Sequence, residues 1–359
     1  MWYQWLISLP MMVCLFWCVY FFIRCMERSR EANVRYSILL FYLASTVLYT
    51  NHWLYFSGVT SFIGSWSYAV ANLSVYPLYY AYLLALTRKR NRNELYILLI
   101  PAAVMLVFCP FNRFFGWIDQ PDVLLPARIC FAIQVVWVWY RGGQLVRNTC
   151  RTLDDTYADN RSYLLKPTHI LLGLISVTAA SSILLNILGS SFFAGNSLIA
   201  VPAVIMSLLL YLLGYVAAHT VLPPDTVAQP ENPEEDRATT EETDELMNRI
   251  ATALREKRLF ANPHLTIQDL AAAVGSNRTY VSNCINRRTG LSFSQYVARY
   301  RVEHAQLILR TPQYMSDHEA IADAVALSGF SSDQSFYRVF KEVTGITPLQ
   351  YRRQNLSKD

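Results

Sequence analysis

Long runs of apolar residues fill the first 220 positions of this 359-residue chain and constrain its fold more than any other feature. Each run approaches the ~20 mostly apolar residues that an α-helix needs to cross a bilayer. The seven runs are 2–23, 36–56, 62–86, 95–111, 123–140, 168–188 and 197–219. Lipid offers the backbone no hydrogen bonds, and the runs lack the alternation of barrel strands, so each should be helical. The sequence therefore predicts a seven-helix transmembrane bundle.

Basic residues gather in alternate loops between these runs. Three loops carry thirteen Lys and Arg, whereas the three loops between them carry only Arg113. The basic loops are 24–35, 87–94 and 141–167. The positive-inside rule places these loops in the cytoplasm and the N-terminus outside. With an odd number of spans, everything after His219 is then expected in the cytoplasm, and the first run is expected to be an uncleaved anchor.

A change of composition divides the chain after the last run. Residues 222–243 hold four prolines, seven acidic residues, one Arg and no aromatic residue. This composition cannot bury a core, so it predicts an extended linker. We therefore expect a transmembrane anchor or sensor domain at 1–221, the linker at 222–243 and a soluble domain at 244–359. Their net charges are +7, −6 and +4, which the total of +5 conceals.

Helix signals in the soluble part form two similar units. In the first, Thr266 to Asp269 is a capping box, Gly275 ends the helix, and Asn277 can cap a second helix reaching about Arg288. This order of helix, glycine turn and helix is a helix-turn-helix. Upstream, Thr243 can cap an earlier helix.

The second unit repeats this pattern after a long helix that begins at Ser292 and ends near Arg310. A helix from about Glu319 to Leu327 is followed by Gly329, and a capping box at 331–334 opens a helix at 333–344. Pro348 then starts a short final helix. Gly329 lies 54 residues after Gly275, so two equivalent units are expected on one connecting helix.

The second helix of each unit carries polar residues at its exposed start. A recognition helix of this kind fits the major groove of B-DNA, and a rigid connecting helix would fix the spacing of two. The first set is Arg278, Thr279, Ser282 and Asn283, and the second is Asp333, Gln334, Tyr337, Arg338 and Lys341. The doubled pattern predicts binding to double-stranded promoter DNA.

Residues from about 246 to 353 resemble the AraC/XylS-type DNA-binding domain. The resemblance rests on LTIQDLAAAVGSNRTYVSNCINRRTGLSFSQYV (265–297), RVEHAQLIL (301–309) and IADAVALSGFSSDQSFYRVFKEVTGITPLQYRR (321–353). It implies an all-α fold of seven helices with two helix-turn-helix units, and sequence-specific transcriptional control. It places both polar sets at bases or phosphates, and Lys341, Arg352 and Arg353 at phosphates.

The chain also departs from the family that it resembles. Cys284, Ile285 and Asn286 stand where the first recognition helix commonly has an aromatic and a basic residue, which puts its base contacts in doubt. The soluble sugar-binding arm of the family is replaced by the apolar runs. The resemblance therefore does not identify what the membrane region senses.

Together these patterns predict a membrane-tethered one-component transcription regulator of the bacterial inner membrane. Its expected partners are promoter DNA, the lipid bilayer, a second copy in a homodimer, and an unidentified small-molecule or protein signal. Arg128 and Asn186, polar residues in two of the runs, are candidate ligand contacts. Signal-dependent dimerisation, or release of the DNA-binding domain from the basic inner loops, would transmit the signal.

Two other classes of function compete with this hypothesis. The first is a membrane transporter or receptor whose C-terminal helical domain binds a protein. The second is a membrane enzyme, which no catalytic motif supports: GxxxxGK[ST], GxGxxG, GxSxG, HExxH and CxxC are all absent. The seven cysteines are expected to act as small hydrophobes, and neither a cofactor nor a metal site is expected.

Overall fold

The computed structural model describes most of the chain, and every regular element that it describes is a helix. The described residues are 2–27, 31–58, 66–89, 92–115, 120–159, 161–188, 200–220, 222, 240–311 and 316–356. They form fourteen α-helices, and a single antiparallel bridge joins Tyr157 to Thr266. The expected all-α fold is confirmed. Most of the expected linker, 223–239, lies outside the described residues.

The chain divides into two compact units, which are described separately below. The N-terminal unit comprises Met1–Asn148 and Leu164–Val227, and the C-terminal unit comprises Thr149–Tyr163 and Ala228–Asp359. The segment 149–163 thus packs with the C-terminal unit, although it lies within the first of the expected domains. The expected domain boundaries themselves stay a prediction.

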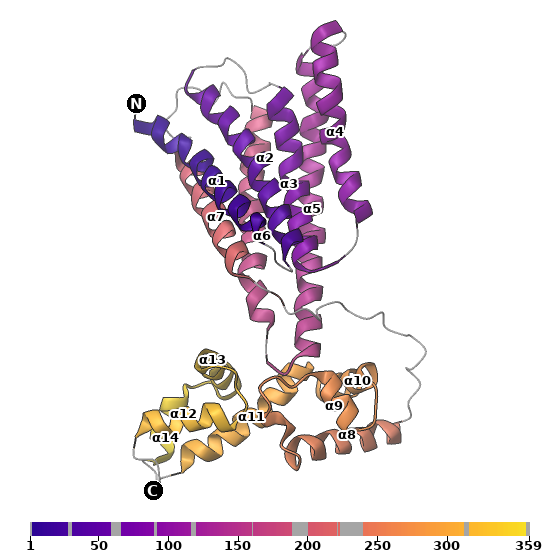
Figure 1. Cartoon of the computed structure of the whole chain (residues 1–359), viewed down its shortest axis with the longest axis vertical. Coiled ribbons are helices and arrows are strands. Elements are labelled where there is room, and N and C mark those ends of the chain that lie inside the picture. Colours follow the sequence, from indigo (N-terminus) through magenta and orange to yellow (C-terminus); the bar gives the residue numbers. More distant parts are fainter. Residues whose placement is uncertain are drawn as a thin grey trace. The chain divides into compact units, whose positions relative to one another are not determined.

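Seven helices account for the seven apolar runs of the N-terminal unit (Figure 1). They are α1 (Trp2–Met26), α2 (Ala32–Phe56), α3 (Trp66–Leu86), α4 (Arg92–Phe115), α5 (Gln120–Thr156), α6 (Lys166–Leu188) and α7 (Ala200–His219). The beginnings of two runs, 62–65 and 197–199, lie outside the described residues. A short 3-10 helix, Ser162–Leu165, precedes α6. Helix α5 continues well beyond its apolar run.

Three helical stretches are long and apolar enough to cross a membrane, within the part of the chain that the structure describes. They are Trp5–Met26, Ser67–Leu86 and Ala200–His219. Shorter apolar helical stretches occur at Asn93–Phe108 and Ser162–Val177. The structure therefore confirms the helices of the expected bundle, while the crossing of a membrane by all seven stays a prediction.

Polar side chains in this unit connect neighbouring helices. The Tyr42 hydroxyl on α2 donates to the backbone oxygen of Leu210 on α7 at 2.7 Å. Gln134 on α5 is 3% exposed and donates to the backbone oxygen of Leu98 on α4 at 2.7 Å. Such bonds satisfy polar groups that apolar surroundings would otherwise leave unpaired. Gln134, one of the polar residues within the apolar runs, thus has a packing role.

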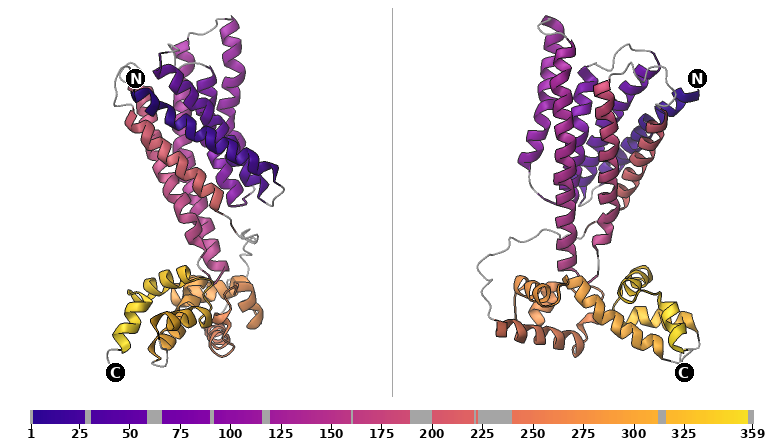
Figure 2. Two further views of the ribbon diagram at one scale, coloured as in Figure 1. Left: turned by 60° about the vertical axis from the view of Figure 1, so that its left-hand side comes forward. Right: turned by 180° about the vertical axis from the view of Figure 1, so that it is seen from behind.

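The C-terminal unit is built on one long helix that both halves share (Figure 2). Its helices are α8 (Thr240–Arg255), α9 (Ile267–Ala273), α10 (Arg278–Thr289), α11 (Phe293–Arg310), α12 (Asp317–Leu327), α13 (Asp333–Thr344) and α14 (Pro348–Leu356). The first half of α11 buries Phe293 and Val297 against α8–α10, and its second half buries Val302 and Leu309 against α12–α14. The seven helices implied by the sequence resemblance are confirmed.

Local capping explains where most of these helices begin. Thr266 with Asp269 forms a reciprocal capping box, as expected, and Ser292 with Gln295 forms another at the expected start of α11. The Asn277 side chain accepts from the backbone nitrogen of Tyr280 at 2.7 Å and caps α10. Each cap satisfies a backbone donor that the first turn of a helix leaves unpaired.

One expected cap and two expected helix starts are wrong, although α13 spans 333–344 as expected. The cap of α13 is Ser332, whose hydroxyl accepts from the backbone nitrogen of Ser335 at 3.2 Å, and not Ser331. Helix α12 begins two residues early, at Asp317 after its cap Ser316. Helix α8 begins at Thr240, ahead of the expected cap Thr243. At α12 and α13 more than one nearby polar residue could serve as the cap, so the local sequence alone does not determine which one does.

Gly329, in the turn between α12 and α13, is required by close packing as well as by its backbone angle. Its φ of +76° lies in the left-handed region, which side chains other than glycine rarely adopt. A Cβ added there would meet the backbone oxygen of Phe260 at 2.4 Å. The second helix-turn-helix therefore contacts the backbone of the first half directly through this residue.

We expect Gly329→Ala to destabilise the C-terminal unit far more than Gly275→Ala. Both glycines have positive φ, which costs alanine about 1–2 kcal/mol, but nothing lies within 4 Å of a Cβ at Gly275. Hydrogen–deuterium exchange of α12 and α13 in the purified full chain should show loss of amide protection only for Gly329→Ala. Equal protection in the two variants would contradict the close contact.

Candidate DNA-binding surface

Helix α10, the second helix of the first helix-turn-helix, separates buried from polar side chains. Val281, Cys284 and Ile285 face the core of the first half. Thr279 and Ser282 are half-buried and Asn283 is exposed. Burial raises the pKa of the Cys284 thiol, which keeps it protonated. Cys284 and Ile285 are therefore core residues, and the polar residues expected to contact DNA lie outside this buried face of α10.

Helix α13 separates its two faces in the same way. Ser335, Phe336, Val339 and Phe340 are buried against α11, α12 and α14. The other face carries the five polar residues expected at the second DNA contact, and four of these five are exposed. The exposed members are Asp333, Gln334, Tyr337 and Lys341, and Arg338 is half-buried. The structure thus brings the five residues expected at the second DNA contact onto one helix face.

Helices α10 and α13 lie on the same side of the C-terminal unit, at opposite ends of α11 (Figures 1 and 2). The 18 residues of α11 correspond to about 27 Å of helix. Because its two halves belong to two separate cores, this helix holds the two polar faces at a fixed separation. Such an arrangement suits two successive contacts on one side of a duplex.

Arg301, in the middle of α11, joins the two halves from inside. Its side chain is 2% exposed, and its guanidinium donates to the backbone oxygens of Phe260 at 2.9 Å and Asn262 at 2.8 Å. Burial lowers its pKa to about 10, and the nearby Asp159 carboxylate opposes that shift. Arg301 therefore stays charged at neutral pH, with backbone oxygens as its partners.

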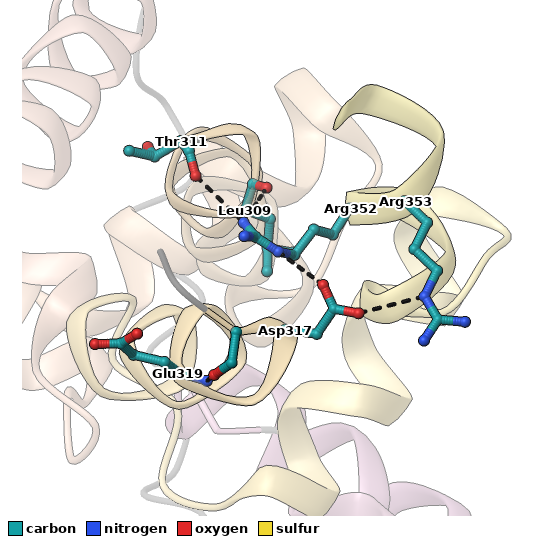
Figure 3. Close-up of polar contacts among 7 residues, drawn as sticks. Leu309, Thr311, Asp317, Glu319, Arg352 and Arg353 are labelled. Carbon is teal, nitrogen blue, oxygen red and sulfur yellow. Dashed lines mark hydrogen bonds and ion pairs between the residues drawn. The ribbon is translucent and has the colours of Figure 1, made fainter. Parts of the chain in front are cut away.

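Arg352 and Arg353, neighbours on α14, have different environments (Figure 3). Arg352 is 3% exposed, pairs with Asp317 at 3.0 Å, and donates to the backbone oxygens of Leu309 at 3.1 Å and Thr311 at 3.3 Å. The Arg353 side chain is 69% exposed and approaches the other Asp317 oxygen at 3.3 Å. The expected phosphate contact at Arg352 does not fit its burial and is withdrawn; Arg353 remains accessible.

A segment that the sequence did not mark as functional lies against this surface. The end of α5 and the residues after it, 149–163, belong to the C-terminal unit. The Thr156 hydroxyl accepts a hydrogen bond from the Arg278 guanidinium at 3.0 Å. The Arg338 guanidinium lies over the Tyr163 ring, 4.8 Å from its centroid. One sequence feature could have drawn attention to this segment. Asp154, Asp155 and Asp159 are acidic residues in a loop whose other charged residues are basic.

The expected ligand contacts are not brought into a described site. Arg128 lies on α5 with an exposed side chain, and Asn186 lies near the end of α6, where the side chains are outside the described part of the structure. Among the described residues, no group of three His, Cys, Asp or Glu side chains is placed to hold a metal ion. The ligand hypothesis stays a prediction.

Comparison with known proteins confirms the resemblance of the C-terminal third. A protein family described as "Helix-turn-helix domain" matches residues 270–354, and this part of the chain is a helix-turn-helix domain of the AraC type. The match covers both polar faces and the connecting helix. No solved structure shows a significant match to the chain.

Several curated transcriptional regulators share this region. An uncharacterised HTH-type transcriptional regulator of Bacillus subtilis, YtdP, is 33% identical over 93 residues, which cover 26% of this chain and 11% of the relative. One from Staphylococcus aureus is 35% identical over 88 residues, covering 24% and 11%. The melibiose operon regulatory protein of Escherichia coli is 32% identical over 89 residues, covering 25% and 28%. The chain thus matches between about a tenth and just over a quarter of these relatives.

We expect Arg352→Met to loosen the C-terminal unit and Arg353→Met to leave it intact. Removing the buried guanidinium leaves the Leu309 and Thr311 oxygens without their donor, at a cost of about 1–3 kcal/mol. Amide exchange in α12 and α14 of the full chain should accelerate for Arg352→Met alone. A lower DNA affinity with unchanged protection would instead show that Arg352 contacts a phosphate.

Proposed function

We propose that this protein is a membrane-tethered, one-component transcription regulator that reads promoter DNA through α10 and α13. The observation that carries the proposal is the pair of polar faces held apart by α11 in a helix-turn-helix domain of the AraC type. Regulation of transcription is also what the names of the matching relatives state for those proteins.

Base contacts are assigned to the polar residues at the starts of the two recognition helices. In α10 they are Arg278, Thr279, Ser282 and Asn283, and in α13 they are Asp333, Gln334, Tyr337 and Arg338. An Asn or Gln amide can pair with adenine, an Arg with guanine, and an Asp can accept from cytosine. Lys341 and Arg353, both exposed, are assigned to phosphates.

The N-terminal unit supplies the membrane anchor in this proposal. Three helices already meet the length and composition of a span, and outward side chains on α1 and α4 are apolar. On α1 the exposed ones include Leu15, Phe16, Val19 and Phe22, and on α4 Ile97, Ile100, Val104 and Val107. An apolar surface of this kind is costly in water and suited to lipid. All seven helices cross the bacterial inner membrane, with the basic loops and the C-terminal unit in the cytoplasm.

The signal enters through the membrane region. Arg128 and Asn186 are assigned to a small-molecule or protein signal, since charged and polar groups within apolar runs commonly mark such sites. The domain limits follow the change in composition, with an anchor at 1–221, an acidic linker at 222–243 and the DNA-binding domain at 244–359. A homodimer is the form in which two such chains would occupy adjacent DNA sites.

We expect the full chain in lipid nanodiscs to bind a subset of genomic fragments, with an affinity that falls steeply as salt rises. Gln334→Ala should weaken specific binding by about 1–3 kcal/mol and relax the base preference at one position. Lys341→Ala should weaken binding to all sequences and lower the salt slope by about one. Gel-shift titrations at several salt concentrations measure both effects.

The matched control is Lys257→Ala, which removes a lysine of the same unit from the turn after α8 and should leave the salt slope unchanged. If neither the full chain nor the fragment 240–359 binds any genomic DNA at low salt, the regulator proposal fails. A captured protein partner in place of DNA would favour the receptor alternative.

The membrane topology is open to a direct test in intact cells. In a cysteine-free background, Ser57→Cys should react with a membrane-impermeant maleimide added outside, because the loop after α2 is expected outside. Asn91→Cys, in a basic loop, and Ser357→Cys, near the C-terminus, should react only after the membrane is permeabilised. Labelling of Asn91→Cys in intact cells would overturn the proposed orientation.

A further inference from the structure

A short segment at the end of α5 and just after it is built into the C-terminal unit. It comprises residues 156–159 and 161–163 and is called the strap below. The backbone nitrogen of Ala158 donates to the backbone oxygen of Leu265 at 3.0 Å, beside the bridge between Tyr157 and Thr266. Ala158 is 3% exposed and packs in the hydrophobic core of the first helix-turn-helix. Backbone bonds and burial together fix the position of the strap on this unit.

The strap also reaches the arginine that joins the two halves of the unit. The Arg301 guanidinium donates to the backbone oxygen of Ala158 at 3.3 Å, in addition to its two bonds with the turn at 260–262. The strap therefore supplies one of three backbone oxygens around a buried cation. Its removal would leave part of that guanidinium without a partner inside the protein.

The two ends of the strap engage both recognition helices. Thr156 accepts from Arg278, in the first turn of α10, and the Tyr163 ring lies under Arg338 of α13. These are the two arginines that the proposed function assigns to DNA bases. An arginine that donates to Thr156 or stacks on Tyr163 is not free to place the same guanidinium on a guanine or a phosphate.

Between these contacts, an acidic side chain occupies the beginning of α13. The Asp159 carboxylate accepts from the Ser331 hydroxyl at 2.7 Å and from the Ser335 hydroxyl at 3.0 Å. The N-terminus of a helix attracts negative charge, so a carboxylate there takes a place that also suits a DNA phosphate. It also repels the phosphates of an approaching duplex.

We propose that the strap is a tethered competitor of DNA: docked, it blocks the surface formed by α10 and α13, and DNA binds only after it leaves. This regulation rests on the proposed function, because it assigns the same surface to DNA. The strap begins at the last residue of α5 and ends within the 3-10 helix that leads into α6. A change in the packing of those helices would therefore pull directly on the strap, without passing through the linker at 222–243.

The test follows the strap itself in the full chain reconstituted in lipid nanodiscs. The Ala158 amide is the reporter, since its hydrogen bond to Leu265 exists only when the strap is docked. We expect slow hydrogen–deuterium exchange at Ala158 without DNA and fast exchange once low-salt genomic DNA is bound. We also expect Asp159→Ala to raise DNA affinity about tenfold, and Tyr163→Ala to act in the same direction. Asp323→Ala, which removes one acidic residue of α12 away from the strap, is the control for net charge and should change affinity less than twofold.

The outcomes separate this inference from the proposed function. DNA binding by the wild type with an Ala158 amide that stays protected would overturn the strap while leaving the regulator proposal standing. Equal affinity gains in Asp159→Ala and Asp323→Ala would overturn it too, because only overall charge would then matter. DNA binding by Asp159→Ala but not by the wild type would support it. If no variant binds DNA at low salt, both proposals fail.

Discussion

The buried guanidinium of Arg301 is the interaction on which the rest of the C-terminal unit depends. It holds the turn at 260–262 and Ala158 around the centre of α11 through three backbone oxygens. Three separate stretches of chain thereby converge on one cation without a carboxylate as its direct hydrogen-bond partner in the described contacts. Because guanidinium hydrogen bonds are directional, this arrangement fixes positions as well as lowering energy. Gly329 then brings the second half against the same turn.

A shared helix makes the two halves of this unit interdependent. Phe293 and Val297 belong to one core, Val302 and Leu309 to the other, and Arg301 stands at the boundary. A change in the packing of either core is therefore expected to shift α11, which positions both polar faces. At the C-terminal end of α11, Arg352 has a similar role. It connects α14 to the last turn of α11 through Leu309 and to the first turn of α12 through Asp317. Buried arginines position this surface, whereas exposed polar residues are proposed to contact DNA.

Structural features that depend on neighbouring residues in the sequence could be predicted. Features that depend on contacts between distant residues could not. Thr266 and Ser292 could be recognised as caps because the cap and its partner lie three residues apart. Ser331 and Ser332 are adjacent, and a carboxylate 172 residues away from Ser331 binds its hydroxyl, so only the fold shows which serine caps α13. Arg352 and Arg353 look alike in sequence, and packing buries one of them. The strap could not be predicted, because it has no periodicity or motif of its own. Its position depends on contacts with residues more than a hundred positions away in the sequence.

The length of α5 has a mechanical consequence. The helix continues for sixteen residues from Arg141 to Thr156, beyond the end of its apolar run at Tyr140, which corresponds to roughly 24 Å of helix. In the proposed topology, this part of α5 is a lever arm that pivots at the membrane surface. A tilt of about 10° at this pivot would carry its tip by about 4 Å, more than the length of a hydrogen bond. A movement too small to disturb the packing of a helical bundle would be enough to part Thr156 from Arg278.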